Sequence, residues 1–447
     1  MSSHATEAPR NESLVRRVVG ASTIGTIMEW YDFYLYGFSA ALIFNVLFFP
    51  QFDPLAGTLA AFGSYALGFF ARPIGGLVFG HVGDRIGRRA MLVTTMTIMG
   101  VATLLMGLLP TYSQIGIWAA VLLTVLRVVQ GFAAGAEFGG AVVLAGEYAP
   151  RRRRALYMSL PSAGIFVAII CSVGVLQLLS AVMSESTFLA WGWRVPFLLS
   201  IVLVGVGLYL RLRISESPEF VELQRKKELA RRPVVEVLRT YPRELLLAMG
   251  TRFAETGGGY IVITFVLTYL AQQVQVGTGI GQAGLLIASA VALVMVPVYG
   301  FISGRVGRKP VYLLGAAGLG AFIVPYFALL NTGSTALIWI AMIVSLGVFY
   351  AAMGGSQPAM YAEIFDARVR VTGLVAIREI SAPIAGGIAP FVATALLIAA
   401  DGASWPIAVY VIAMCIVSTI CVLPIRLRSG FIDEYEAKPR QQKVVTQ

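Results

Sequence analysis

Several kinds of functional site are nearly missing from this chain of 447 residues. It has two histidines, His4 and His81, and three cysteines that lie singly in apolar runs, too few for a metal centre or a disulfide framework. No glycine is followed by lysine, so the G-x-x-x-x-G-K-[ST] phosphate loop is absent. We therefore expect no metal and no cofactor, and any transport by this chain has to run on a gradient.

Charged residues are also scarce. They make up 13% of the chain, against 57% hydrophobic residues, and the mean hydropathy is +0.79. A soluble protein of this size has no way to bury so much apolar surface, which predicts a polytopic protein of the lipid bilayer. We do not expect an enzyme, because no pairing of a nucleophile with a base stands out.

A window of about 19 residues predicts twelve apolar transmembrane helices and hence an all-α fold. They fall near residues 18–49, 55–79, 90–109, 115–147, 155–183, 194–211, 244–274, 281–303, 310–330, 335–364, 373–399 and 405–425. The first 17 residues are polar and no small-residue cleavage site follows a short apolar core, so we expect a retained first helix and no removable signal peptide.

The 34 basic residues outnumber the 23 acidic ones, and their distribution explains the excess. All but five lie in the termini and in loops on one side of the predicted bundle. The positive-inside rule then places both termini in the cytoplasm and removes the reason to expect nucleic acid as a partner. The five exceptions lie within or at the edge of spans: Arg72, Arg127, Arg194, Arg252 and Arg378.

The chain repeats itself. Residues 78–89 align with 298–309 at a spacing of 220, and residues 147–154 align with 363–370 at a spacing of 216. Two matches at nearly one period predict two pseudo-symmetric six-helix halves. The predicted parts are an N-terminal half (1–211), a cytoplasmic linker (212–242) with a short surface helix over Glu219–Arg231, a C-terminal half (243–425) and a cytoplasmic tail (426–447).

The first span carries two carboxylates in the run Glu29-Trp30-Tyr31-Asp32. An ionisable residue at that depth costs several kcal/mol, so it marks a functional site by default. At helical spacing Glu29, Asp32 and Tyr36 share one face. We expect Asp32, with Glu29, to couple transport to protons; the alternative is that both carboxylates only maintain packing.

The motif G-x-x-x-D-R-x-G-R-R at residues 80–89 resembles the signature loop of the major facilitator superfamily. More specific segments are similar to the metabolite:proton symporter family: residues 29–33, 70–76, 127–131 with 135–137, and 191–197. Within that family the N-terminal half is most similar to shikimate permeases, through residues 57–62 and 78–81. The family also includes carriers of 2-oxoglutarate, citrate, proline and betaine. Residues 426–447 show no heptads that would match the coiled coil of the osmosensing betaine carrier.

The resemblance implies a location in a bacterial plasma (inner) membrane. It also implies a cytoplasmic gate at the repeated loops; the alternative is that these loops are plain anchors. Gate residues are expected at Asp84, Arg85, Arg88, Arg89, Glu137, Glu147, Arg305, Arg308 and Glu363. The second copy of the loop has Gly304 where the motif has an aspartate, which argues against a symmetrical gate.

In this superfamily the first, fourth, seventh and tenth spans line a central cavity, so the resemblance lets Asp32 and Arg127 face each other or a shared substrate. We expect Arg127 to bind a substrate carboxylate; the alternative is a permanent structural pair. The predicted substrate-binding residues are Arg127, Gln130, Tyr31, Tyr36, Arg252, Glu255, Tyr260 and Gln357. An Arg252–Glu255 pair with little function is equally open, and three glycines at 257–259 predict a bend. Arg72 pairs with Glu29 or acts in transport, and Arg378 and Glu379 receive no role.

The leading hypothesis is a monomeric, proton-coupled importer of a small carboxylate, such as shikimate or a di- or tricarboxylate, working by alternating access. Alternatives are an efflux antiporter of the same fold, an importer of a zwitterionic osmolyte, and a membrane sensor. Efflux members usually carry a glycine-rich motif ending in Gly-Pro in the fifth span, and residues 159–164 have no such run. A sensor needs a sizeable soluble domain, for which no loop is long enough.

Overall fold

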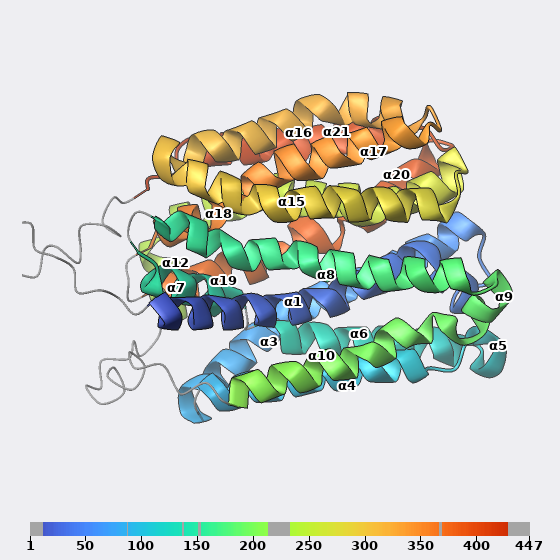
Figure 1. The fold of residues 1–447 in the computed structure, drawn as a ribbon, viewed down its shortest axis with the longest axis horizontal. Coiled ribbons are helices and arrows are strands. Elements are labelled where there is room, and N and C mark those ends of the chain that lie inside the picture. Colours follow the sequence, from blue (N-terminus) through green and yellow to red (C-terminus); the bar gives the residue numbers. More distant parts are fainter. Residues whose placement is uncertain are drawn as a thin grey trace, which may run out of the picture.

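The computed structural model describes residues 12–86, 88–135, 138–150, 153–212, 233–365 and 369–427. Over these ranges the chain forms helices that run side by side along the long axis of the molecule (Figure 1). Helix α1 begins and helix α21 ends at the same end of the bundle, here called the terminal end; the other is the opposite end.

The N-terminal half is made of the first group of helices, in which η denotes a π-helical turn. These are α1 (Glu12–Leu42), α2 (Phe44–Leu47), α3 (Pro54–Ile86), α4 (Arg88–Leu108), α5 (Tyr112–Ile115), α6 (Ile117–Ala134), α7 (Phe138–Tyr148), α8 (Arg154–Val182), α9 (Glu185–Thr187), η2 (Phe188–Gly192) and α10 (Arg194–Leu212).

The C-terminal half contains more π-helical turns than the N-terminal half does over the described ranges. Its elements are α12 (Pro233–Thr240), α13 (Pro242–Arg252), η3 (Phe253–Gly258), η4 (Ile261–Phe265), α14 (Val266–Tyr269), η5 (Leu270–Val274), α15 (Thr278–Val306), α16 (Arg308–Leu330), α17 (Thr335–Ile343), η6 (Val344–Tyr350), α18 (Ala351–Ala362), α19 (Arg370–Ser381), η7 (Ala382–Gly387), α20 (Ala389–Ala399) and α21 (Trp405–Val422).

The helices are long enough to cross a bilayer. In the described residues nine continuous segments are both long and apolar enough, and a pair bent by 43°, Glu185–Gly192 with Arg194–Tyr209, forms a tenth. The shorter apolar helix Val93–Leu108 and α1, which carries buried Glu29 and Asp32, complete the set. The predicted all-helical membrane fold of twelve spans in two halves is confirmed, whereas the surface helix predicted over Glu219–Arg231 lies outside the described residues.

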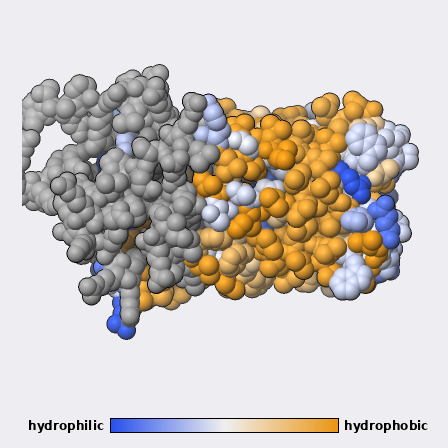
Figure 2. Space-filling view, turned by 90° about the horizontal axis from the view of Figure 1, so that it is seen from below, coloured by the Kyte–Doolittle hydropathy of each residue, from blue (hydrophilic) through white to orange (hydrophobic). Residues whose placement is uncertain are grey.

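The surface of the bundle suits a lipid environment. Figure 2 shows apolar side chains covering the middle of the molecule on one face, with polar side chains gathered at the opposite end. Large apolar side chains such as Leu178, Val202, Val294 and Ile420 are more than half exposed. Their exposure is favourable only where acyl chains replace water.

Helices α3 and α6 approach each other closely at glycines. A Cβ atom on Gly131 would lie 1.9 Å from the carbonyl oxygen of Gly68, and one on Gly135 would lie 2.2 Å from that of Arg72. Small residues spaced by four allow two membrane helices to come into backbone contact. This contact brings Arg72 of α3 and Arg127 of α6 into the same buried region beside α1.

The two halves touch at both ends of the bundle. At the opposite end, the Gln272 side-chain amide donates to Thr58 Oγ1 at 2.9 Å and the Thr268 hydroxyl donates to the Ala41 carbonyl at 3.3 Å. Toward the terminal end α7 packs on α19, so tightly that a Cβ on Gly139 would lie 2.5 Å from Val375 Cγ2. The halves are therefore in contact at both ends of the bundle.

Candidate functional site

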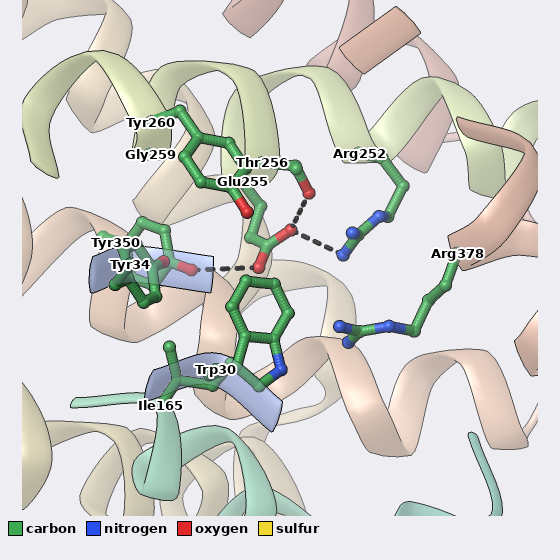
Figure 3. A pocket seen from close by; sticks show the side chains of 10 residues that line it. All are labelled: Trp30, Tyr34, Ile165, Arg252, Glu255, Thr256, Gly259, Tyr260, Tyr350 and Arg378. Atoms are coloured by element: carbon green, nitrogen blue, oxygen red, sulfur yellow. Dashed lines mark hydrogen bonds and ion pairs between the residues drawn. The ribbon is translucent and has the colours of Figure 1, made fainter. Parts of the chain in front are cut away.

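A small cavity lies between the halves and is lined by side chains of both (Figure 3). Its volume is about 10 Å³, room for about one water molecule. The lining residues come from α1, α8, η3 and its flanking residues, η6 and α19: Trp30, Tyr34, Ile165, Arg252, Glu255, Thr256, Gly259, Tyr260, Tyr350 and Arg378. Much of the wall is irregular helix, since Glu255 and Thr256 lie in η3 and Tyr350 ends η6. π-Helical turns are frequent at functional sites.

Glu255 is the acidic group of the cavity, and it is fully engaged. Its Oε2 accepts from Arg252 Nη1 at 2.7 Å and from the Thr256 hydroxyl at 2.5 Å, and its Oε1 accepts from the Tyr350 hydroxyl at 3.2 Å (Figure 3). Gln357 Oε1 accepts a further bond from Arg252 at 3.3 Å. The predicted intrahelical pair of Arg252 and Glu255 is formed, and it lines the cavity.

Arg378 is the other cation of the cavity, and sequence analysis assigned it no role. Its guanidinium carbon lies 3.4 Å from the centroid of the Phe138 ring, and its head group points toward the cavity and Trp30 (Figure 3). Among the described residues the Arg378 guanidinium has no hydrogen bond or ion pair, and its Nε is fully buried. The one available signal was its place among the five basic residues that lie in spans.

Four polar groups at the cavity lack a hydrogen-bond partner among the described residues. Over the part of the chain that the structure describes, the Trp30 Nε1, Tyr260 hydroxyl, Arg252 Nε and Arg378 Nε atoms are buried without a hydrogen-bond partner. All four can donate a hydrogen bond, and the Tyr260 hydroxyl can also accept one; a buried donor without an acceptor costs free energy. The cavity therefore favours a ligand rich in acceptor oxygens.

Arg127 lies outside this cavity, enclosed by aromatic rings within the N-terminal half. Its guanidinium carbon is 4.2 Å from the centroid of Phe33 and 4.5 Å from those of Tyr36 and Tyr65. Gly68 makes room for it, since a Cβ there would lie 2.8 Å from Arg127 Nε. Arg127 has no exposed surface, and stacking on rings stabilises its charge.

A relay of hydrogen bonds joins Arg127 to Asp32. Arg127 Nη1 donates to Gln130 Oε1, Gln130 Nε2 donates to Thr103 Oγ1 at 2.7 Å, and the Thr103 hydroxyl donates to Asp32 Oδ2 at 2.8 Å. Every donor points toward the carboxylate, an arrangement in which successive bonds polarise one another. The cation and the carboxylate are thus linked through two neutral side chains.

Arg72 holds two carboxylates. Its Nη2 lies 3.0 Å from Glu29 Oε1, and its Nε lies 2.8 Å from Glu379 Oε2. Glu29 is therefore bound to Arg72. Within the described ranges no group of three or more histidine, cysteine, aspartate or glutamate residues could hold a metal ion.

Several predicted substrate-binding residues lie outside the cavity. Arg127 is joined to Asp32 through Gln130 and Thr103. Because Arg127, Gln130, Tyr31 and Tyr36 are not in the cavity lining, their contacts with a substrate stay predictions. The Tyr31 hydroxyl donates to the Pro196 carbonyl at 2.9 Å, and Tyr36 shares a hydrogen bond of 2.6 Å with Ser64. The physical reason is the rotation of α1: Trp30 and Tyr34 face the cavity, so the Glu29, Asp32 and Tyr36 side chains face neighbouring helices.

The predicted gate is only partly described. Arg308 Nη2 pairs with Glu363 Oε1 at 2.8 Å, a contact within the C-terminal half, and exposed Arg305 stacks on the Phe301 ring at 4.2 Å. The remaining predicted gate side chains lie outside the described residues: Asp84, Arg85, Arg88, Arg89, Glu137 and Glu147.

Comparisons with known proteins agree with this architecture. Residues 19–377 match the family described as the Major Facilitator Superfamily. The chain is 38% identical to the shikimate transporter of Escherichia coli (strain K12) over 427 residues, which cover 95% of this chain and 97% of that protein. It is 34% identical to the proline/betaine transporter of the same strain over 423 residues, 92% of this chain and 83% of that protein.

A solved structure shares the fold. The xylose transporter XylE from E. coli, in a partially occluded inward-open conformation, gives a TM-score of 0.70 at 18% identity and covers 92% of this chain and 97% of its own. The resemblance found in the sequence is thereby confirmed. With its family, its relatives and its fold in agreement, this chain belongs to the major facilitator superfamily and is a multi-pass membrane transporter of small metabolites.

Proposed function

We propose that this chain is a proton-coupled importer of a small, oxygen-rich metabolite that bears one carboxylate. It works as a monomer by alternating access of its two halves, with the terminal end in the cytoplasm of a bacterium. The observation that carries the proposal is Arg378, a buried cation that points into the central cavity and has no anionic partner among the described residues.

The charges around the cavity favour a single negative charge on the substrate. Arg252 and Glu255 neutralise each other at 2.7 Å, so Arg378 is the one cation of the lining that lacks a counter-charge there. A planar guanidinium matches a carboxylate with two parallel hydrogen bonds. A second or third carboxylate would enter a buried site that offers no further uncompensated cation, which is costly.

The unpaired donors favour oxygen atoms elsewhere on the substrate. The Trp30 indole N–H and the Tyr260 hydroxyl are buried at the cavity without acceptors among the described residues. Hydroxyl groups on a small ring or chain would satisfy them, and rings such as Tyr34 and Tyr350 suit its apolar face. These features favour a hydroxylated monocarboxylate, the class to which the substrate named for the shikimate transporter belongs.

The small volume of the cavity supports alternating access. About 10 Å³ cannot hold a metabolite, so side chains or whole halves have to part before loading. The halves meet through separate contacts at the two ends, and alternating access requires one set to part while the other holds. Rocking of one half against the other around a central site is how such folds transport.

Proton coupling is assigned to Asp32. Its carboxyl group is 4% exposed and receives the Thr103 hydroxyl at 2.8 Å, yet no ion pair to it is seen in the described ranges. A membrane carboxylate without a direct cationic partner exchanges a proton at less cost than one held in an ion pair. The relay from Arg127 stabilises its ionised form, and movement of α1 against α6 would alter that support.

A zwitterionic substrate is the second candidate. Four aromatic side chains, Trp30, Tyr34, Tyr260 and Tyr350, stand with Glu255 around the cavity, a set that also suits a substituted ammonium group. We rank it second because the contacts of Glu255 with Arg252, Thr256 and Tyr350 are already made.

Counterflow in proteoliposomes tests the proposal. Shikimate, 2-oxoglutarate, citrate, proline and betaine are compared with wild-type protein, Arg378→Lys and Arg127→Lys. We expect exchange of shikimate, weakened by about tenfold or more in Arg378→Lys, because an ammonium cannot reproduce the planar fork. If wild-type protein exchanges betaine, and Arg378→Lys exchanges it at the same rate, the result would favour a zwitterionic substrate. If substrate binding is lost in Arg127→Lys but kept in Arg378→Lys, Arg127 is the residue that binds the substrate carboxylate, as the sequence predicts.

A further inference from the structure

Arg72 ties the two halves together through a buried ion pair. Its Nε donates to Glu379 Oε2 at 2.8 Å and its Nη2 to Glu379 Oε1 at 3.3 Å. Arg72 lies in α3 of the N-terminal half and Glu379 in α19 of the C-terminal half. The side chains are 3% and 7% exposed, so little water competes for these bonds. Any movement that parts α3 from α19 has to break the pair.

The same arginine has a second carboxylate in its own half. Arg72 Nη2 also donates to Glu29 Oε1 at 3.0 Å, and α1 and α3 both belong to the N-terminal half. When the halves part, Glu29 stays with Arg72 and prevents an unpaired cation inside the membrane, which would be costly. The bond to Glu379 can therefore break and re-form while the Arg72 guanidinium keeps Glu29 as its ion-pair partner.

The pair lies beside the cavity. Glu379 directly follows the lining residue Arg378 in α19, and Glu29 directly precedes the lining residue Trp30 in α1. Arg378 also stacks on Phe138 of the other half.

We infer that Arg72 and Glu379 form a latch that holds the two halves together beside the cavity and opens once in each transport cycle, with Glu29 as the resident counter-ion of Arg72. All three are positioning residues. The inference rests on the alternating access proposed above, but not on the identity of the substrate or on proton coupling.

Disulfide cross-linking between the halves tests the latch. Ala155 of α8 and Gly304 of α15 suit a cysteine pair, because a Cβ built on Gly304 lies 3.7 Å from that of Ala155, within the usual disulfide range. The rate of copper-phenanthroline cross-linking in proteoliposomes without solute reports how often this region is closed. Each single-cysteine variant controls for the native cysteines Cys171, Cys415 and Cys421.

Three changes are compared in that background. Glu379→Gln removes the negative charge of the latch, and Glu379→Asp keeps the charge on a shorter side chain. Glu185→Gln is the control, because it makes the same change of acid to amide at an exposed position of α9. We expect cross-linking to slow about fivefold or more in Glu379→Gln and less in Glu379→Asp, and to be unchanged in Glu185→Gln.

A wild-type cross-linking rate in folded Glu379→Gln protein overturns the latch. If the Gln variant cannot be recovered folded, the Asp variant decides: a rate lowered by about twofold or more supports the latch, and an unchanged rate overturns it. Because the assay contains no solute, a wrong substrate assignment leaves its result unaffected.

Discussion

The Thr103 hydroxyl donates to Asp32 Oδ2 at 2.8 Å, and among the described residues this bond connects the proposed proton-coupling carboxylate to the rest of its half. Beyond Thr103 lie the Gln130 amide and the Arg127 guanidinium. The carboxylate is therefore stabilised through a relay, and coupling should depend on neutral side chains as well as on charged ones.

Asp32→Asn removes the exchangeable proton while keeping the shape of the side chain. We expect accumulation driven by a pH gradient to be abolished, while counterflow, which needs no net proton movement, is retained within about threefold because the cavity lies elsewhere. Uptake of labelled substrate into proteoliposomes with and without an imposed gradient measures both. Full gradient-driven accumulation in Asp32→Asn would rule out its coupling role.

Thr103→Val deletes the hydroxyl at nearly constant volume. We expect gradient-driven accumulation to fall about tenfold, because the buried Asp32 carboxylate loses its hydrogen-bond donor and Gln130 loses its acceptor. Thr103→Ser keeps the hydroxyl and should stay close to wild type. The two variants are compared in the same uptake assay; equal accumulation in both would mean that the relay is structural only.

Glu255→Gln changes the charge count of the cavity. Arg252 then loses its partner at 2.7 Å, and two cations are left uncompensated instead of one. We expect the preference for 2-oxoglutarate over shikimate, measured by competition in counterflow, to rise about tenfold because a second carboxylate now finds a cation. An unchanged ratio would show that the charge of Arg378 does not select for monocarboxylates.

Gly131→Ala tests the close contact of α3 and α6. The added methyl would lie 1.9 Å from the Gly68 carbonyl oxygen, so the helices have to move apart, and we expect a loss of about 1–3 kcal/mol in stability. Gly205→Ala is the matched control, because nothing lies within 4 Å of its Cβ position and alanine favours helix. Thermal unfolding of the purified variants in detergent measures the effect. Equal melting temperatures would mean that α3 and α6 adjust freely.

Most of the membrane architecture could be predicted from the sequence because its causes are local along the chain. A span of about 20 apolar residues has to cross the bilayer as a helix, since no other open structure satisfies its backbone in lipid. The repeat at a spacing of 220 residues indicated two halves in the same way. The five basic residues within or at the edge of spans, Arg378 among them, also stood out by composition and depth alone.

The pairing of these buried charges was decided only by the tertiary structure. Spacing put Glu29, Asp32 and Tyr36 on one face of α1, but whether that face meets the cavity or the neighbouring helices depends on the rotation of α1 in the bundle. That rotation follows from packing on α7, α8 and α10, elements that are remote in sequence. With this rotation Trp30 and Tyr34 face the cavity and Glu29 pairs with Arg72. Arg378 is then the cation of the cavity lining that lacks a counter-charge there.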